Sequence, residues 1–588
     1  MNIYMKIKKR ENDIIAILYT FLLCMVLAYF FDYYYEFNDD YFIKNILAGV
    51  YSGTPSAHSV QMLYPLSLIL SGLYCINRNI PWFGLFLNTC QFGCIFLITA
   101  RILTFLEKKW SKILALVLET GIVVALLLHE LVFVQYTFTT ALLAATAAFL
   151  FYTSRLSTDI RGILKNNVIC IILVIVAFNV RSEMLMLMLP MICVTGICKW
   201  ATEKPIFTAK NAMKYFALFG CILIGLLICY VIDVIAYSNP EWKEFRTFFD
   251  NRTELYDFQS IPSYEGNEVF YESIGMAPEE QVLLVNYNFG MDEEIDAAKI
   301  GKVAEYAANL RKEQENDKID VLKDVIKDYI YRTFRGTDVP WNLFAVVMYV
   351  LVLICACNNR HFQFVWELGF MGIIRSALWF FLIYRGRLPE RITHSMYLIE
   401  ILILIGMFLG EYSKKKHSKI LFGVGCIVIS FFCSVYLRGN ILEQQNRYIK
   451  AELRNKPYKI LKEYTKEHSD NYYFWDVASF TPYTEKMFVD VDNSLSNLDI
   501  MGGWLYKSPL TRQKLAAFGF ESMEDAIVKE ENVYVIVATK EREDSPCFVD
   551  WITAYYAYRE QSVTVEQVDS LYADGEEKFK IYQVNSTK

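Results

Sequence analysis

Two adjacent carboxylates, Asp39 and Asp40, follow closely after the first apolar stretch of this 588-residue chain. Residues 13–31 are apolar enough to span a bilayer, and the basic run at residues 6–10 holds the start of this span in the cytoplasm. Asp39 and Asp40 are therefore expected at the outer membrane surface. Because ionisable residues are costly at this depth, the pair is a candidate for chemistry.

Further charged residues fall on the same outer side when the chain is threaded in this way. They are Lys44, His58, His129, Glu130, Arg181, Glu183, Arg385, Arg387, Glu390, Arg391 and His394. Arginine suits phosphate because its planar fork donates to two oxygens and stays charged. A carboxylate can take a proton from a nucleophilic hydroxyl. The set predicts a site that binds a phosphate and moves a proton.

About eleven apolar windows are long enough, or nearly so, to cross a membrane. They are 13–31, 82–106, 112–129, 133–152, 167–180, 184–198, 215–236, 341–357, 363–384, 394–411 and 419–437. Short basic loops between them fall on the side of the N-terminus, so an odd number of crossings places the C-terminus outside. The stretch 57–76 is interpreted as one or two interfacial helices because it contains His, Gln, Ser and Pro. A full crossing there is the alternative, and it would move every later basic loop outside.

Residues 1–437 are thus predicted to form a transmembrane domain whose first outer loop, 32–81, carries interfacial helices. A large outer loop at 237–340 ends in a charged amphipathic helix over about 292–334, where apolar residues recur at helical spacing. The outer parts contain no glycine-rich phosphate loop, nucleophile elbow or metal-spaced His/Cys set.

The last part of the chain, 438–588, has the pattern of a small extracytoplasmic α/β domain. Strands are predicted at 471–477 and 532–539, a closing hairpin turns near Asp574 and Gly575, and helices such as 443–468 lie between. The predicted fold class is therefore a polytopic α-helical membrane protein with a small α/β domain at its C-terminus.

Composition fits this class and excludes others. Apolar residues make up 54% of the chain, more than a single globular core needs. The net charge of −6 gives no electrostatic footprint for a nucleic-acid partner. Nearly all of the 14 cysteines lie in predicted spans, where Cys behaves as a small hydrophobe, so neither a disulfide framework nor a zinc set is predicted.

The order of these motifs resembles the superfamily of C-type (GT-C fold) glycosyltransferases, which includes protein O-mannosyltransferases and the aminoarabinose transferases of lipid A. The likeness lies in the layout of residues 1–437. An acidic motif, NDDYF (38–42), is followed by the proline-bearing stretch LYPLSLILSGLY (63–74) and a second outer acidic position in HELVFVQYTF (129–138). Late in the chain, YRGRLPERITHSMYL (384–398) looks like the element that opens an outer-facing helix in these families. The sequence departs from the pattern where His129 precedes Glu130 and where Pro65 stands alone.

The resemblance implies transfer of a sugar from a polyprenyl-phosphate carrier to a glycan, lipid or protein acceptor at the outer face of the plasma membrane, with inversion. Asp40, or failing that Asp39, would be the base on the acceptor. The carrier phosphate would be held by Arg387 and Arg391 with Arg181, while Glu130 and His58 would orient acceptor or phosphate. Lys44 and Arg385 join the candidate phosphate-binding set.

Three questions stay open at this level. The sequence implies no certain cofactor and leaves a metal requirement open, because Asp39, Asp40 and Glu130 could hold a divalent cation that neutralises the leaving phosphate. A flippase or transporter of lipid-linked glycan would also need arginines and carboxylates in a membrane cavity, but the sequence has no internal repeat typical of many transporters. A polysaccharide polymerase or ligase is the third interpretation, although such enzymes usually concentrate their arginines in one large late loop.

Overall fold

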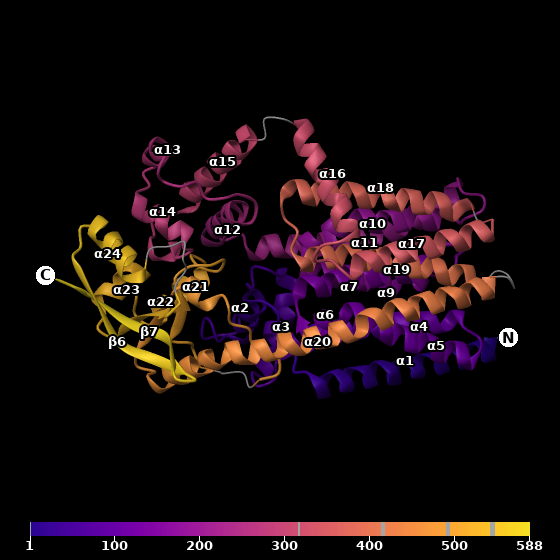
Figure 1. The fold of residues 1–588 in the computed structure, drawn as a ribbon, viewed down its shortest axis with the longest axis horizontal. Helices are drawn as coiled ribbons and strands as arrows, with labels where there is room; N and C mark the ends of the chain where they lie inside the picture. The colour runs from indigo at the N-terminus through magenta and orange to yellow at the C-terminus, as the bar shows by residue number, and fades with distance from the viewer. Residues whose placement is uncertain are drawn as a thin grey trace.

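The computed structural model describes residues 2–314, 318–360, 362–412, 418–489, 494–540 and 547–587. Within these residues the protein is mostly helical, and nine helices are long and apolar enough to cross a membrane, or ten if one bent pair counts as a span. They run side by side, with the N-terminus at one end of the bundle and a small sheet beyond the other (Figure 1). The prediction of a polytopic helical fold is confirmed at this level, with fewer full-length spans than the eleven expected.

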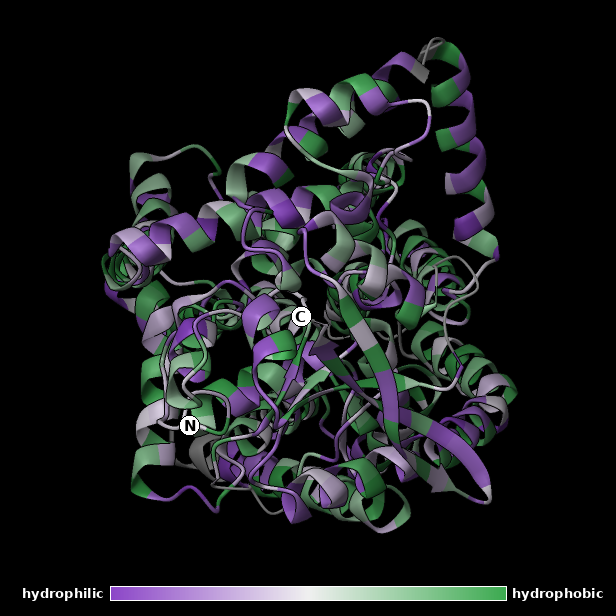
Figure 2. Ribbon diagram, turned by 90° about the vertical axis from the view of Figure 1, so that its left-hand side faces the viewer, coloured by the Kyte–Doolittle hydropathy of each residue, from purple (hydrophilic) through white to green (hydrophobic). Residues whose placement is uncertain are grey.

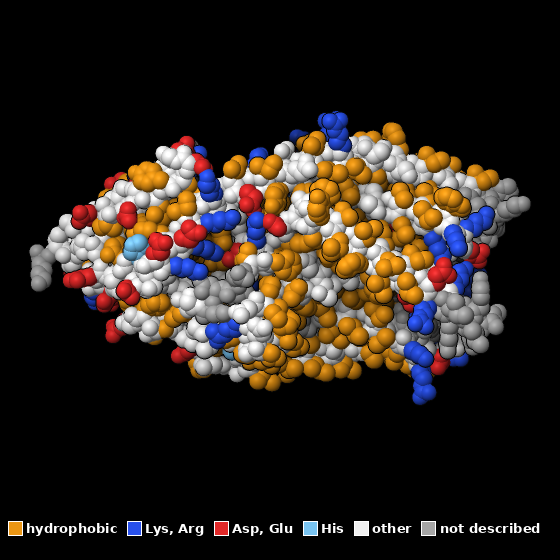
Figure 3. All heavy atoms as spheres, turned by 90° about the horizontal axis from the view of Figure 1, so that it is seen from below, with side chains coloured by type: hydrophobic (Ala, Val, Ile, Leu, Met, Phe, Trp, Pro, Cys, Tyr) orange, Lys and Arg blue, Asp and Glu red, His pale blue; other side chains and the backbone are white. Residues whose placement is uncertain are grey.

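Nine helices with the length and hydropathy of a membrane span form the bundle within the described residues. They are α1 (Asn2–Phe30), α4 (Trp82–Phe105), the continuous run α5 (Lys109–Ile122), η1 (Val123–Leu127) and α6 (Leu128–Val132), α10 (Ser182–Ala201), α11 (Ala209–Ala236), α17 (Trp341–Asn358), α18 (Phe362–Arg385), α19 (Glu390–Tyr412) and α20 (Ser418–Glu467). Large apolar side chains stay exposed along α1, α11 and α20. On the face shown in Figure 3, apolar side chains cover much of the middle of the molecule, and basic side chains gather towards the end where the N-terminus lies. An exposed apolar surface of this extent fits a protein embedded in a membrane.

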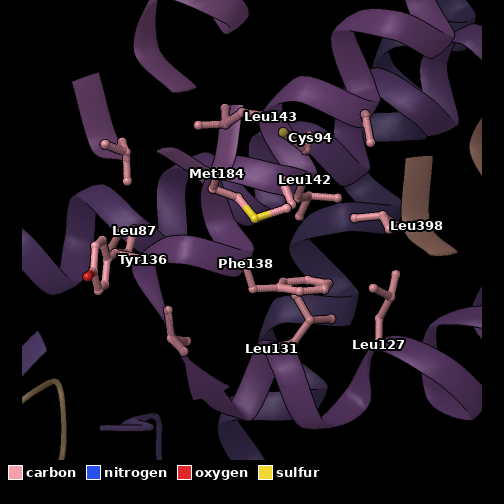
Figure 4. Close-up of a cluster of buried hydrophobic side chains, with 14 of the residues drawn as sticks. Leu87, Cys94, Leu127, Leu131, Tyr136, Phe138, Leu142, Leu143, Met184 and Leu398 are labelled. Atoms are coloured by element: carbon pink, nitrogen blue, oxygen red, sulfur yellow. The ribbon is translucent and has the colours of Figure 1, made fainter. Parts of the chain in front are cut away.

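Two expected crossings are shorter than a full span. The window 133–152 forms α7 (Tyr136–Tyr152). The helix begins after Gln135, whose side chain caps its first turn by accepting a hydrogen bond from Phe138 N. Nearly every residue of α7 is buried, so this helix lies in the centre of the bundle. Its Phe138 and Leu142 side chains lie among side chains of α4, α6, α10 and α19 (Figure 4). The window 167–180 forms α9 (Val168–Val180), bent by 59° from α8 (Ile160–Asn166).

The last span does not end near residue 437. Instead α20 continues without a break to Glu467, so the predicted helix 443–468 is its second half. A helix of 50 residues is about 75 Å long at 1.5 Å per residue. It therefore extends out of the bundle and carries the chain directly into the C-terminal domain (Figure 1).

The C-terminal domain is built on a five-stranded sheet of order β4-β3-β5-β7-β6. Its strands are β3 (Tyr472–Trp475), β4 (Leu498–Ile500), β5 (Val533–Ala538), β6 (Val563–Ala573) and β7 (Glu576–Ser586). The strands β3, β4 and β5 are parallel, and β7 pairs antiparallel with β5 and β6. The predicted strands and hairpin are confirmed, and the turn residues Asp574 and Gly575 both have positive φ, as a tight two-residue hairpin turn requires.

Short helices complete this domain and the large loop. In the domain they are α21 (Val477–Phe480), α22 (Pro509–Ala517), α23 (Met523–Lys529) and α24 (Phe548–Tyr558); in the loop they are α12 (Pro240–Phe258), α13 (Glu268–Ser273), α14 (Pro278–Val285), η2 (Phe289–Met291), α15 (Ala297–Gln314) and α16 (Lys318–Phe334). Loop and domain share one apolar core, in which Leu283 and Ile300 pack with Phe474 and Val535. Seen from this end, the surface elements carry many hydrophilic residues (Figure 2).

The prediction of a single charged helix over 292–334 is wrong in its extent. Two helices, α15 and α16, occupy this stretch, and α15 begins only at Ala297. The Asp296 carboxylate accepts a hydrogen bond from Lys299 N, which satisfies a free N–H of the first turn and fixes the start of the helix there.

The first outer loop contains β1 (Tyr34–Tyr35), α2 (Asn38–Ala48) and α3 (Tyr64–Ile76). With 13 residues, α3 is too short to cross the membrane as a straight helix. Its placement in the interface stays a prediction.

Candidate functional site

The candidate site is built where the first outer loop meets the start of α7. The strand β1 pairs in parallel with β2 (Phe133–Val134), and Glu36 N donates to Val134 O at 3.0 Å. This pairing brings the Glu36 carboxylate to 2.9 Å from His129 Nε2. Two segments nearly one hundred residues apart are thereby fixed against each other.

Asp40 holds α2 against α7. Its side chain is fully buried, and Oδ1 accepts a hydrogen bond from Tyr136 N, the first residue of α7, at 3.1 Å. Its other oxygen, Oδ2, is buried without a hydrogen-bond partner among the described residues. Burial, and next the charge of Asp39, raise the pKa of Asp40 well above its ordinary value, although the Tyr136 N–H opposes the shift. Asp39 itself is partly exposed.

Arg181 reaches the same place from the break between α9 and α10. Its guanidinium donates to Gln61 Oε1 and to the Tyr136 hydroxyl, and its Nε lies 3.1 Å from Glu183. It also lies over the Tyr136 ring, 5.2 Å from the centroid. Tyr136 therefore links the two charges, with its backbone bonded to Asp40 and its side chain bonded to Arg181.

Arg391 completes the group from the first turn of α19. It stacks over the Phe37 ring at 4.8 Å, and in the part of the chain that the structure describes it forms no salt bridge. Its charge is near enough to Asp40 to lower the pKa of that carboxyl against the effect of burial. Tyr136 thus connects Asp40 to Arg181, and the charge of Arg391 acts on Asp40 from a third part of the sequence.

Arg385 and Arg387 have other partners. Arg387 Nη1 lies 2.7 Å from Asp257 Oδ2, and Arg385 Nη2 lies 3.5 Å from Glu254. Both guanidinium groups stack over the Phe258 ring. These contacts hold the end of α18 to α12, so we interpret the two arginines first as a structural junction beside the site.

Lys44 and His58 also have contacts that explain them structurally. Lys44 is buried and donates to Glu485 of the C-terminal domain at 2.5 Å. His58 stacks on Trp242 with centroids 4.6 Å apart, and its Nε2 lies 3.3 Å from the carbonyl of Ala236. Burial lowers the pKa of His58, which favours a neutral ring unsuited to holding a phosphate.

Glu130 lies in a second polar group next to the first. It is buried, and one carboxylate oxygen bonds His394 Nδ1 at 2.9 Å, while His394 stacks on Trp341. The other oxygen of Glu130 and the Nε2 of His394 are buried without hydrogen-bond partners among the described residues. Among the described residues, Asp39, Asp40 and Glu130 do not bring their ligand atoms close enough together to hold one metal ion. The group whose ligand atoms do lie within 4.8 Å of one another is Glu36, His129 and Glu130.

A cavity of about 740 Å³ lies between α16, α17 and α18. Its lining is mostly apolar and includes Gly369 and Gly372, whose missing side chains leave open space. Arg375 also lines it, but this guanidinium is already held by Glu400 at 3.0 Å and by the Tyr329 hydroxyl at 2.5 Å. The cavity therefore suits an apolar chain better than a phosphate.

Sequence reasoning missed Glu36, Gln61 and Tyr136. Glu36 carried a usable signal, because it stands in the same outer loop as Asp39 and Asp40. Gln61 and Tyr136 carried none, since a polar residue in an interfacial stretch and a tyrosine at the start of an apolar window are both common.

In comparisons with protein-family models, with curated proteins and with solved structures, none matches this chain.

Proposed function

We propose that this protein is an integral-membrane glycosyltransferase of the C type, which moves a sugar from a polyprenyl-phosphate carrier to a cell-envelope acceptor. The observation that carries the proposal is the connection of Asp40 to Arg181 through Tyr136, with the charge of Arg391 near enough to act on Asp40. These are the groups needed to take a proton from an acceptor and to hold a phosphate.

The site lies outside the cell in this proposal. On the face shown in Figure 3, basic side chains gather towards the opposite end of the bundle, where the N-terminus lies, whereas near the C-terminal domain they are mixed with acidic ones. Because basic residues favour the cytoplasmic side, this end is assigned to the cytoplasm of the plasma membrane. The site and the C-terminal domain are then extracytoplasmic, as the lipid-linked donor requires.

Asp39 is assigned as the general base, although the sequence favours Asp40. A base must contact the acceptor hydroxyl, and Asp39 is partly exposed while Asp40 is fully buried and bonded to Tyr136 N. Asp40 is a positioning residue in this account, because it holds the helix that carries Asp39 against α7.

The reaction is a single displacement. As Asp39 takes the proton, the acceptor oxygen attacks the anomeric carbon, and the bond from this carbon to the carrier phosphate breaks with inversion. The polyprenyl phosphate leaves with the bonding electrons and one more negative charge. Arg391 and Arg181 offer prepositioned cations for this charge. Arg181 already forms a salt bridge with Glu183, whereas Arg391 stacks on Phe37 and forms none among the described residues.

The cavity between α16, α17 and α18 is assigned to the apolar chain of the carrier. It opens beside helices whose outer ends flank the site, and α18 leads from Arg375 to Arg385 over about 15 Å at 1.5 Å per residue. An isoprenoid chain would fill apolar space there while its phosphate extends towards Arg391.

The test uses membranes that contain the overproduced chain and polyprenyl-phosphate sugars labelled in the sugar. Label leaving the lipid fraction measures transfer to any acceptor that the membranes contain. Asp39→Asn is expected to slow transfer by about 100-fold or more, which is the usual contribution of a general base. The control Asp320→Asn changes an exposed carboxylate on α16 and should transfer normally.

Two results would count against the proposal. Unchanged transfer by Asp39→Asn would remove the base assignment. If no donor of a broad panel is transferred faster than in membranes that lack the chain, the proposed glycosyltransferase activity is contradicted.

A further inference from the structure

The helix α16 of the large loop exposes an apolar stripe. Ile319, Leu322, Ile326 and Ile330 are each between 39% and 65% exposed. They recur every three or four residues, so they lie on one face of the helix. We propose that this stripe lies in the surface of the lipid bilayer, at the end of the bundle that carries the C-terminal domain. The inference goes beyond sugar transfer and does not depend on it.

The orientation of α16 suits this place. In Figure 1 the spans run along the horizontal axis, whereas α16 runs steeply across them near the end of the bundle that carries the C-terminal domain. Asn342, in the first turn of α17, donates from Nδ2 to the carbonyls of Arg332 and Arg335 at 2.9 and 3.0 Å. The last turn of α16 is thus fixed at the level where the span α17 begins. A helix that crosses the direction of the spans at this level has the geometry of an interfacial helix.

The stripe lies beside the lipid-facing surface of the span α18. Tyr329, next to Ile330 in the sequence, turns towards this span: its hydroxyl lies 2.9 Å from Ser376 Oγ, and its ring packs edge-on against Phe380. Phe381, the next residue of α18, is 55% exposed. Exposed apolar side chains on a span face lipid, so the bilayer that surrounds α18 is the surface nearest to the stripe.

The charges of α16 are distributed as a lipid surface requires. At about 3.6 residues per turn, Lys323 and Lys327 lie at one edge of the stripe, whereas Asp324 and Asp328 lie on the opposite face. A lysine at the edge can extend its ammonium to lipid phosphates while its aliphatic part stays beside the acyl chains. Lipid phosphates repel carboxylates, and these two carboxylates are turned away from the stripe.

The contact with lipid has a consequence for the cavity between α16, α17 and α18. Tyr329 and Thr333 of α16 line this cavity. With its stripe in the bilayer surface, α16 holds this wall of the cavity at the level of the lipid headgroups. A lipid of the surrounding membrane can then reach the cavity without leaving the bilayer.

The experiment places a fluorescent amino acid at Leu322 of the full-length protein, in nanodiscs of phosphatidylethanolamine and phosphatidylglycerol. A second version carries the probe at Asp324, which is exposed on the opposite face. Iodide in the buffer quenches probes in water, and lipids with a nitroxide near the top of the acyl chain quench probes in the bilayer. The probe at Leu322 should be quenched strongly by the nitroxide lipid, and several-fold less by iodide than the probe at Asp324.

A charge within the stripe supplies a second, independent measurement. Ile326→Glu, with the probe kept at Leu322, should release the helix from the lipid and reduce nitroxide quenching to the level seen at Asp324. The control Tyr331→Glu adds the same charge at an exposed residue on the far side of α16 and should leave the quenching unchanged.

Two results would overturn the proposal. Equal iodide quenching at Leu322 and Asp324 would place the stripe in water. A probe at Leu322 that neither quencher reaches would show that protein, from this chain or a second copy, covers the stripe in place of lipid.

Discussion

The helix α2 carries two buried charged groups whose chemistry differs sharply. Towards the C-terminal domain, Lys44 bonds one oxygen of Glu485 and Lys462 bonds the other at 3.1 Å. Towards the bundle, Asp40 has one oxygen bonded and one without a partner among the described residues, and Glu130 is in the same state. The first group is fully satisfied, whereas the second keeps free buried oxygens.

The difference separates structural charge from functional charge. A buried polar atom without a partner costs free energy, so it persists where something else uses it. The Lys44–Glu485–Lys462 cluster is thus expected to hold the C-terminal domain on the bundle. The residues around Asp39, Asp40 and Glu130 are expected to bind a ligand at some cost to stability.

The largest effect should come from breaking the satisfied cluster. Glu485→Gln leaves Lys44 buried without its counter-charge, and this should destabilise the protein by about 3–5 kcal/mol. The measurement is thermal unfolding of the purified protein followed by tryptophan fluorescence. Asp320→Asn, an exposed carboxylate, is the control and should unfold like wild type. A variant as stable as wild type would show that this cluster does not hold the domain.

The same cluster should give the protein an acid-sensitive component of stability. Burial alone would raise the pKa of Glu485, but Lys44 and Lys462 outweigh it and lower the pKa from 4.5 to about 2. The stabilisation is therefore complete above pH 4.5 and lost as the pH falls towards 2. A shift of this size corresponds to about 3 kcal/mol at most. Unfolding temperatures measured between about pH 7 and pH 3 should fall more steeply for wild type than for Glu485→Gln, and parallel curves would contradict the assignment.

A smaller effect, in the opposite direction, is expected at Asp40. Burial and Asp39 raise its pKa, so its charged form is disfavoured in the folded state. Asp40→Asn keeps an oxygen for the Tyr136 N–H and removes the charge, so stability should stay within about 1 kcal/mol of wild type or rise. Sugar transfer should fall far less than in Asp39→Asn. A loss of stability as large as that of Glu485→Gln would remove the contrast between the two groups.

Local patterns in the sequence predicted the parts of the fold that follow from local physics. The apolar windows, the strands around Tyr473 and Val535 and the turn at Asp574 all have local signatures. The continuity of α20 had none, because the polar residues after 437 are equally typical of the start of a separate helix. The full burial of α7 depends on its neighbours and not on its own length or hydropathy.

The candidate site was foreseeable only in part. Threading the chain placed Asp39, Asp40, Arg181 and Arg391 on one side, and the structure brings their charges close together. The same reasoning could not separate Arg391 from Arg387, because a salt bridge to Asp257 depends on tertiary packing. The contact of His129 with Gln444 was equally hidden, since it joins two helices more than 300 residues apart in the sequence.

Binding of polyprenyl phosphate is the most direct measurement of the central claim, which is that Arg391 beside the Asp39–Asp40 pair receives the phosphate of a lipid carrier. Binding to the full-length protein in nanodiscs can be followed by native mass spectrometry. Arg391→Gln should weaken it by about tenfold or more, as loss of a charged hydrogen-bonding partner does. Arg447→Gln, which changes an exposed arginine on α20, should bind like wild type. Equal affinity in wild type and Arg391→Gln would contradict the account.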